Sequence, residues 1–388
     1  MRKNAAHLVI ILLTIFLFSG CLGGREINDL EIVIGMGVDK GQDTQDIIIT
    51  AQVVKEAEVG RTSDESGGGK AYWNVTGNGK SVFDAIRKVT HKTGNRLFVS
   101  HSQVVIFGND LASEGLQEYI DFFLRAHEMR PTALILIAED QAADIMDAKP
   151  ETEKFPAINI VKLVKSYRFT SHFYKVNMKD FVSSLMCETT APTAPIVKVM
   201  EEEGQKNIHI YGMAVFKNDK MVGKLVHEET RGLLWVLGKV ESGILLVPYP
   251  EDQGLLSLEI LKAESKVTPK IENGKIVMHI KIKQESSLAE QSSALNLTTM
   301  SVFEKIEKAQ SEVIRKEIMT AFEKSKELNA DKFGFGRMLH KKYKNEWEKL
   351  KDRWDEVYPT IELDIEIEAK IQKTDLLVKP AAPGQKEE

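Results

Sequence analysis

The sequence predicts an α+β protein of several domains, with mixed β-sheets and helices packed on them. Apolar, β-branched runs typical of strands alternate along the chain with amphipathic stretches of helical period. The length of 388 residues also suits two or three domains of ordinary size, each with its own core. We therefore expect separate α+β units rather than one continuous fold.

The first 20 residues are typical of an export signal. Two basic residues precede the run 8–18, which is apolar except for Thr14, and Ser19-Gly20 leads into Cys21. A helix needs about 20 apolar residues to cross a hydrocarbon core, so this run is too short for a permanent span. Lipoprotein processing acylates a cysteine that directly follows such a cleavage site. We predict cleavage after Gly20 and lipidation of Cys21; a secretory signal with a chance cysteine is the alternative.

Residues 21–150 are expected to form an N-terminal α+β domain. Ser81 has the side chain of a helix cap, and Gly35-Met36-Gly37 is interpreted as a strand feature that permits close backbone packing, because a third glycine and a helix start are missing. Strands are predicted over residues 31–39, 46–55, 72–76, 103–107 and 133–138, and helices over 82–89, 109–124 and 142–148.

The pattern changes after residue 150. Residues 151–205 are expected to form a helical middle segment or small domain that ends in a proline-punctuated stretch, and residues 206–376 a C-terminal α+β domain. Residues 377–388 are expected to be a disordered tail, because they are rich in proline and charge.

The C-terminal domain shows the strongest periodicities. Asn273-Gly274 supplies the positive φ angles of a tight hairpin turn between strands at 254–268 and 275–285. A long amphipathic helix is predicted over 301–328 and another over 335–354. A last strand over 360–371 alternates strictly, so its isoleucines should face one way. Further strands are predicted over 208–217, 220–225 and 242–247.

Composition excludes several functions. The formal net charge is only −5 and every basic run contains acids, so no nucleic-acid partner is expected. The histidines lack metal-ligand spacing, and no phosphate loop or nucleophile elbow is present, so we expect no catalytic residues, metal or cofactor. Cys187 has no patterned histidine partner and is interpreted as a core or near-core residue rather than a nucleophile.

Acidic and aromatic pairs leave a glycosidase as a weaker hypothesis. Glu228-Glu229, or Asp364 with Glu366, would provide paired carboxylates. Alternating carboxylates opposite an apolar strand face more often form a solvated sheet surface. Trp347 and Trp354 are seven residues apart on a predicted helix and are expected to pack against the C-terminal sheet rather than against a sugar.

Several segments, in order along the whole chain, resemble the Ger(x)C family of spore germination lipoproteins. They are Cys21 with residues 25–30, Gly35-Met36-Gly37-Val38-Asp39, the strand 101–108, the helix start 111–115, and the terminal segments 354–359 and 371–376. The family often has Trp-Asp-Arg-Arg-Glu after the lipidated cysteine, whereas this chain has Leu22-Gly23-Gly24-Arg25-Glu26.

The resemblance implies a function that residue spacing alone does not give. Family members are C subunits of nutrient germinant receptors, which lie in the inner membrane of bacterial spores with an A subunit and a multi-spanning B subunit. The chain is then expected to be a non-enzymatic receptor component, anchored by lipid on the outer face of that membrane. A lipid-anchored solute-binding protein and a cell-wall hydrolase are the alternatives.

Overall fold

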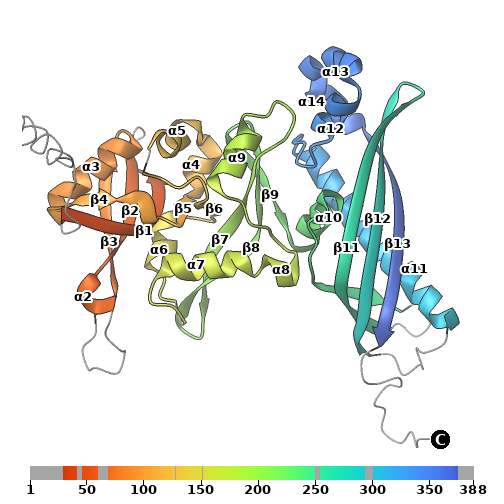
Figure 1. Cartoon of the computed structure of the whole chain (residues 1–388), viewed down its shortest axis with the longest axis horizontal. Helices are drawn as coiled ribbons and strands as arrows, with labels where there is room; N and C mark the ends of the chain where they lie inside the picture. The colour runs from red at the N-terminus through yellow and green to blue at the C-terminus, as the bar shows by residue number, and fades with distance from the viewer. Residues whose placement is uncertain are drawn as a thin grey trace, which may run out of the picture.

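Two β-sheets, each with its own helices, lie side by side along the long axis of the molecule (Figure 1). The computed structural model describes residues 29–41, 46–59, 69–126, 128–150, 152–249, 254–292 and 300–374. The predicted α+β, multi-domain class is confirmed. The expected signal peptide, the lipidation site Cys21 and the tail 377–388 lie outside the described residues.

The first sheet has nine strands in the order β3-β2-β1-β5-β6-β7-β8-β9, with β4 paired to β1. Its centre is parallel, because β1, β5, β6 and β7 run in the same direction, and its outer strands are antiparallel. The central strands β5 and β6 are buried throughout, which is typical of strands covered on both faces. The strands are β1 Leu30–Lys40, β2 Ile47–Val54, β3 Tyr72–Gly79, β4 Arg96–Phe98, β5 Val104–Phe107, β6 Leu134–Ala138, β7 Thr193–Glu202, β8 Gln205–Lys217 and β9 Lys220–Val226.

Helices cover both faces of this sheet (Figure 1). One face carries α3 Val82–Thr93, α4 Asn109–Glu114, α5 Gln117–Arg125 and α9 Met178–Leu185. The other carries α6 Ala142–Asp147, α7 Pro156–Lys165 and α8 Tyr167–Thr170; the short α2 Glu56–Val59 follows β2.

Glycines in β1 allow the helices to approach. A Cβ on Gly35 would lie 2.6 Å from the Cβ of Ala157, and one on Gly37 would lie 3.1 Å from the Cβ of Ala142. The expected role of Gly35-Met36-Gly37 in close packing is therefore confirmed. Asp39, which ends the same motif, accepts hydrogen bonds from the backbone N–H groups at the start of α6, from Ala142 at 2.7 Å and Ala143 at 2.9 Å.

Local signals place only some of the helix ends. Ser81 caps α3 by accepting the N–H of Asp84 at 3.2 Å, as predicted. The single helix predicted over 109–124 is wrong, because Gly115 breaks it into α4 and α5 with a φ of +134°. The turn at Asp219 then supplies acceptors for α5: its carbonyl binds the N–H of Leu116 at 2.9 Å and its carboxylate that of Gln117 at 3.3 Å.

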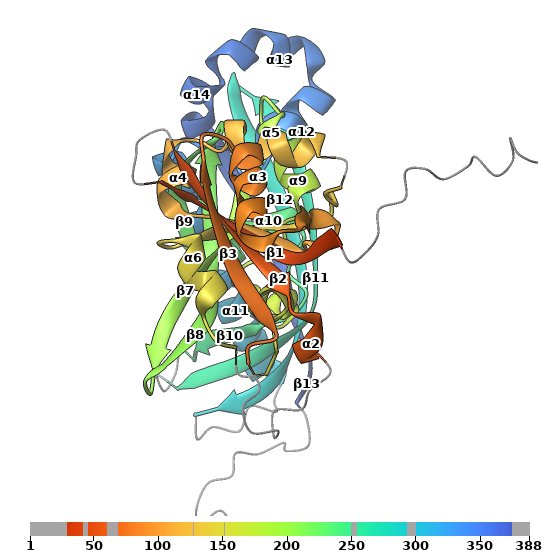
Figure 2. The same cartoon turned by 90° about the vertical axis from the view of Figure 1, so that its left-hand side faces the viewer.

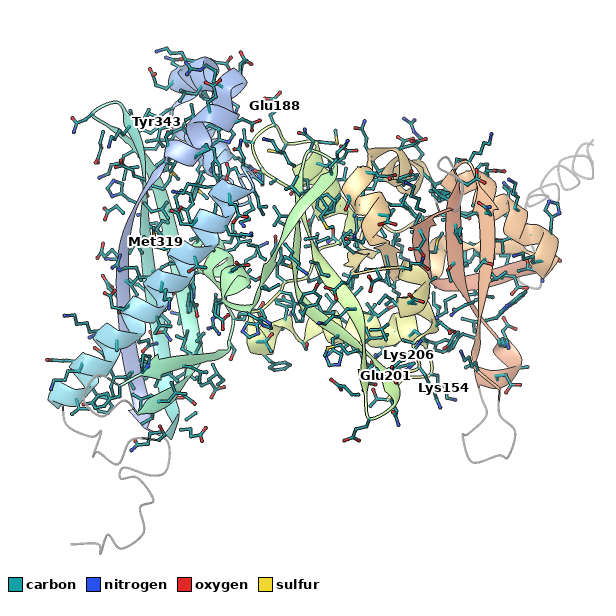
Figure 3. All side chains as sticks on the ribbon, turned by 180° about the vertical axis from the view of Figure 1, so that it is seen from behind. Lys154, Glu188, Glu201, Lys206, Met319 and Tyr343 are labelled. Carbon is teal, nitrogen blue, oxygen red and sulfur yellow. The ribbon has the colours of Figure 1, made fainter. Side chains whose placement is uncertain are left out.

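The hairpin of β7 and β8 joins residues that were predicted from the sequence to lie in different domains. Glu201 pairs with Lys206 near its tip (Figure 3), so the boundary expected between residues 205 and 206 falls at this turn. The sheet continues across the turn, and β8 and β9 are its last strands. Residues 206–226 therefore share a sheet with the N-terminal strands. Residues 193–202, expected to end a helical middle segment with a proline-punctuated stretch, form β7.

The second sheet has the order β10-β11-β12-β13, and the long helix α11 crosses its inner face (Figure 1). The predicted turn at Asn273-Gly274 is confirmed by φ angles of +50° and +79°. The helix predicted over 335–354 is instead broken at Tyr343. The elements are α10 His227–Leu237, β10 Ile244–Pro248, β11 Leu255–Glu272, β12 Lys275–Gln291, α11 Met300–Glu327, α12 Phe335–Lys342, α13 Lys344–Leu350, α14 Trp354–Val357 and β13 Glu362–Thr374.

The isoleucines of β13 face the core beneath α11 as predicted, but not every residue of α11 that was predicted to face this core does so. Ile361 and Ile365 are buried, whereas the acids between them are exposed. The helical period of α11 predicts one apolar stripe of Val302, Ile306, Ala309, Val313, Met319 and Phe322. Met319 is nevertheless 37% exposed (Figure 3). Buried polar side chains of α11 take part in the contact instead: Gln310 accepts from Ser286 of β12 at 3.1 Å.

Candidate functional site

Residues considered for catalysis lie apart in the structure. In the part of the chain that the structure describes, no group of three His, Cys, Asp or Glu residues could hold a metal ion. His279 forms a surface pair with Asp364 at 2.7 Å, and His209 lies 3.4 Å from Glu202. These histidines lie beside acidic side chains on sheet surfaces and do not belong to a converging site.

The candidate glycosidase residues also have structural roles. Asp364 and Glu366 lie on the solvent face of β13, where Glu366 pairs with Lys281 at 2.7 Å. Glu229 accepts the backbone N–H of Val226 at 3.1 Å and so caps the start of α10. The rings of Trp347 and Trp354 are buried, with centroids 5.1 Å apart. They are core residues and offer no exposed stacking surface.

Cys187 is half-buried beside two hydroxyl groups. Its sulfur lies 3.3 Å from Thr189 Oγ1 and 3.6 Å from Thr190 Oγ1. Burial raises the pKa of the thiol, but hydrogen bonds with Thr189 and Thr190 outweigh burial, so the net shift of the pKa is downward. No histidine lines the cleft around it. The expectation of a near-core residue fits this position.

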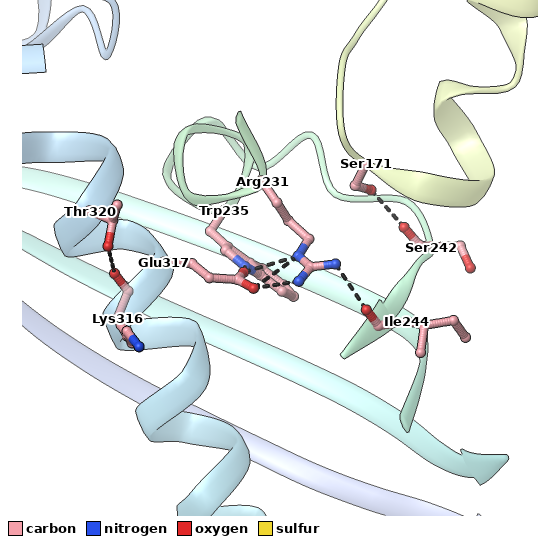
Figure 4. A network of polar contacts seen from close by, with 8 residues as sticks. All are labelled: Ser171, Arg231, Trp235, Ser242, Ile244, Lys316, Glu317 and Thr320. Carbon is pink, nitrogen blue, oxygen red and sulfur yellow. Dashed lines mark hydrogen bonds and ion pairs between the residues drawn. The ribbon is translucent and has the colours of Figure 1, made fainter. Parts of the chain in front are cut away.

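The main polar centre of the chain is a buried junction between the two sheets (Figure 4). The Nε of Arg231 on α10 donates to both carboxylate oxygens of Glu317 on α11, at 3.2 and 3.0 Å. Trp235 Nε1 donates to the same carboxylate at 2.8 Å, and Arg231 also donates to the carbonyl of Ile244 in β10 at 2.9 Å. Arg231 and Glu317 are each about 5% exposed, so the network is almost fully desolvated.

Glycine brings the two helices of this junction together. A Cβ on Gly232 would overlap the backbone carbonyl of Glu317 and lie 2.8 Å from the Cβ of Ala321. Sequence analysis missed α10 altogether. Residues 230–236 are all buried, so they show no alternation of polar and apolar faces. The acidic pair Glu228-Glu229 before the run Leu233-Leu234-Trp235-Val236 was therefore the only sequence signal for this helix.

A second contact between the sheets lies near the start of α12. The backbone N–H of Ala191 donates to the carbonyl of Asp331 at 2.9 Å. The Asp331 carboxylate accepts the N–H groups of Phe335 at 3.0 Å and Gly336 at 2.8 Å, and so caps α12. Burial raises the pKa of Asp331 to about 7, although these hydrogen bonds oppose the rise.

The neighbouring Lys332 is also buried. Its Nζ has no hydrogen-bond partner among the described residues. Burial lowers the pKa of Lys332 to about 7, with the charge of Glu229 opposing the shift. No local pattern indicates that Asp331 and Lys332 are buried, since a lysine beside an aspartate on a loop is ordinarily solvated.

Several grooves among the described residues could receive a ligand or partner, and one beside α5 and α9 has a volume of about 1100 Å³. Two others lie near the features described above. One, of about 520 Å³, lies between α3 and α5 within the first sheet unit and is lined by Phe83, Phe122 and charged residues at its rim. The other, of about 280 Å³, lies between the sheets around Cys187 and Asp331. The inter-sheet groove is smaller than the range of about 300–1,000 Å³ common for small-molecule sites.

Comparison with known proteins decides the family. Residues 23–199 match the model described as "Spore germination protein N-terminal domain", and residues 211–375 match "Spore germination B3/ GerAC like, C-terminal". The chain belongs to the Ger(x)C family of spore germination proteins. The expected family membership is therefore confirmed over nearly the whole chain.

Individual relatives support the Ger(x)C assignment. Spore germination protein KC of Bacillus subtilis (strain 168) is 27% identical over 406 residues, covering 98% of this chain and 98% of the relative. Spore germination protein B3 of the same organism is 22% identical, covering 95% and 98%. The crystal structure of the GerBC protein matches with a TM-score of 0.59 and 22% identity, covering 87% of this chain and 97% of that one, which shows a shared fold.

The Ger(x)C motifs have clear structural roles. Gly35 leaves room for α7, Gly37 leaves room for α6, and Asp39 caps α6. A Cβ on Gly108, which ends the strand motif 101–108, would overlap the Asp39 carboxylate. These motifs therefore maintain the centre of the first sheet rather than a reactive site. Among the described residues, no helix is both long and apolar enough to span a membrane.

Proposed function

We propose that this chain is the lipid-anchored C subunit of a nutrient germinant receptor, held through Cys21 on the outer face of the spore inner membrane. It supports receptor assembly and germination signalling and catalyses no reaction. The observation that best supports this role is the position of Cys21 after a sequence typical of an export signal, directly before two family regions that cover residues 23–199 and 211–375.

The proposed partners are the A and B subunits of the receptor. A lipid tether confines the C subunit to the surface that its partners occupy, so the effective concentration of their contacts is high. Modest protein interfaces are then sufficient for assembly. Lipoprotein maturation adds at least two acyl chains, and two chains anchor a protein stably where one does so only marginally.

A test of the anchor compares the two cysteines of the chain. Cys21→Ala should abolish incorporation of labelled palmitate and leave the precursor uncleaved or wrongly processed, because Cys21 is the proposed acylation point. Cys187→Ala is the matched control and should incorporate palmitate normally, since Cys187 lies half-buried beside Thr189. Labelling that persists in Cys21→Ala would contradict the anchor.

A second test separates a receptor subunit from an enzyme. Exposed Asp, Glu, His and Ser residues, together with Cys187, are replaced by alanine and scored for nutrient-triggered germination, with subunit levels followed by immunoblot. Rim contacts of an interface contribute little individually, so graded defects that track reduced partner levels are expected. Loss of one catalytic group usually removes orders of magnitude of rate. A single null variant with normal protein and normal assembly would favour an enzyme.

A further inference from the structure

The anchor restricts which part of the molecule can reach the membrane. Asp29 follows Cys21 by eight residues, and a fully extended segment of that length spans at most about 28 Å. The strand β1 then begins at Leu30, and the first residues of this strand pair with β4. Because Arg96 and Leu97 of β4 line the groove between α3 and α5, that groove lies beside the tethered end of the chain.

The helices at this end expose apolar side chains. Phe83 of α3 and Leu124 of α5 are each 51% exposed. The ring of Phe83 lies 6.0 Å from that of Phe122, between centroids. The guanidinium of Arg87 lies over the Phe83 ring, 4.9 Å from its centroid. Phe83, Arg87 and Phe122 line the groove between α3 and α5, whereas Leu124 lies on the other flank of α5, in a neighbouring groove that α9 also lines. We name these four residues the α3–α5 face. Figure 2, viewed from this end of the long axis, shows α3 toward the viewer.

The charges around the α3–α5 face are largely compensated within the protein. Three ion pairs surround it: Lys88 with Asp84 at 2.8 Å, Arg125 with Asp121 at 2.7 Å, and Arg96 with Glu128 at 2.9 Å. Arg87 has a long apolar stem and can place its charge at lipid phosphates while Phe83 lies deeper. Glu118 is exposed at the rim of the groove, on the α5 side.

We propose that the α3–α5 face lies on the outer leaflet of the bilayer, with Phe83 and Leu124 inserted among the lipids. This inference rests on the proposed lipid anchor at Cys21. Amphipathic helices at an interface bury their apolar side at the boundary of headgroups and acyl chains, which is the environment that these side chains suit. The second sheet lies at the opposite end of the long axis (Figure 1), and the exposed Leu246 belongs to its strand β10.

The test measures the depth of labels in lipid. Full-length, lipidated protein is reconstituted in vesicles of equal parts phosphatidylglycerol and phosphatidylethanolamine. Phe83→Cys and Leu124→Cys, each in a Cys187→Ser background, carry a nitroxide spin label. Leu246→Cys is the matched control, because Leu246 is 53% exposed and lies on β10 of the second sheet. Oxygen and a water-soluble nickel complex then report how deeply each label lies.

The expected result is that the ratio of oxygen to nickel accessibility is several-fold higher for the labels at positions 83 and 124 than for the label at 246, which stays in water. Labels at 83 and 124 that stay as water-accessible as the label at 246, in protein that floats with vesicles, would overturn the proposal. Shielding that develops only when other receptor subunits are added would also overturn it and would assign the face to a protein partner. Failure of the protein to float at all would instead contradict the anchor at Cys21. All three labelled side chains are at least half exposed, so their substitution should not disturb the core.

A label-free check uses the double variant Phe83→Ser with Leu124→Ser, which should loosen membrane contact without loss of the anchor. Its α3 should lose the protection from protease that lipid gives to α3 of the unsubstituted protein.

Discussion

Arg231 and Glu317 form a buried pair that joins the helix after the first sheet to the helix beneath the second. Both oxygens of the carboxylate accept from the guanidinium, and Trp235 donates to it as well. Removing one partner would leave the other charge buried without compensation. The pair therefore stabilises the contact of α10 with α11 and, through it, the arrangement of the two sheets.

Glu317→Ala should lower the free energy of unfolding by about 3–5 kcal/mol, the range for one partner lost from a buried ion pair. Urea denaturation followed by tryptophan fluorescence measures this loss. The control is Glu362→Ala, which removes the exposed pair with Lys275 and should cost no more than about 1 kcal/mol. Equal effects of the two substitutions would show that the junction does not have the stability role assigned to it.

Lys332→Met should stabilise the protein at pH 7 and below. The pKa of Lys332 is lowered to about 7 from its usual 10.5, so the folded state binds fewer protons than the unfolded state between those values. Stability from this group therefore rises with pH across that window and is least below pH 7. Methionine removes the buried charge, with an expected gain of about 1–4 kcal/mol below pH 7. Thermal unfolding across the pH range measures it, and a loss of stability at pH 6 would contradict the burial of an uncompensated charge.

Asp331→Asn should flatten the pH dependence on the acidic side. Burial raises the pKa of Asp331 to about 7, so the folded state keeps a proton that the unfolded state loses from about pH 4 upward. The contribution of Asp331 is therefore fully present below its unfolded pKa and is lost as pH rises to about 7. Asparagine retains one acceptor for the N–H groups of Phe335 and Gly336. Asparagine resembles the neutral, protonated carboxyl, so the melting temperatures of wild type and variant should agree best near pH 4 and separate as the pH rises to 7, where the wild type loses stability. Parallel curves would argue against titration of Asp331.

Ile365→Asp should destabilise the second sheet unit by several kcal/mol, because it buries a charge beneath α11 where Ile365 is 8% exposed. Glu366→Gln, on the opposite face of β13, is the control and loses only a surface pair with Lys281. Thermal unfolding distinguishes the two. A melting temperature unchanged by Ile365→Asp would be incompatible with this facing of β13.

Elements with strong local signals could be predicted from the sequence. Asn273-Gly274 specifies its hairpin turn and Ser81 its helix cap, because each depends on one or two residues and their own backbone. The facing of β13 follows from strict alternation. Gly35-Met36-Gly37 was also interpreted correctly, since a strand without a third glycine leaves close packing as its main use.

Elements that depend on distant partners could not be predicted. The helix α10 is buried between two units, so it lacks the polar face that creates a helical period. Pro195 suggested an irregular boundary, but it lies in β7 just outside the two residues that pair with β6. The polar junction of Arg231 with Glu317 joins residues 86 positions apart, and no local pattern indicates that they meet.

The β7–β8 hairpin has a consequence for how this protein can vary. The two family regions end and begin at residues 199 and 211, within the paired length of that hairpin. A chimera that joins the first region of one relative to the second region of another must therefore match strand register, from Thr193 opposite Val215 to Glu202 opposite Gln205. The two halves of this protein cannot be exchanged without regard to that register, and we expect them to have been inherited together.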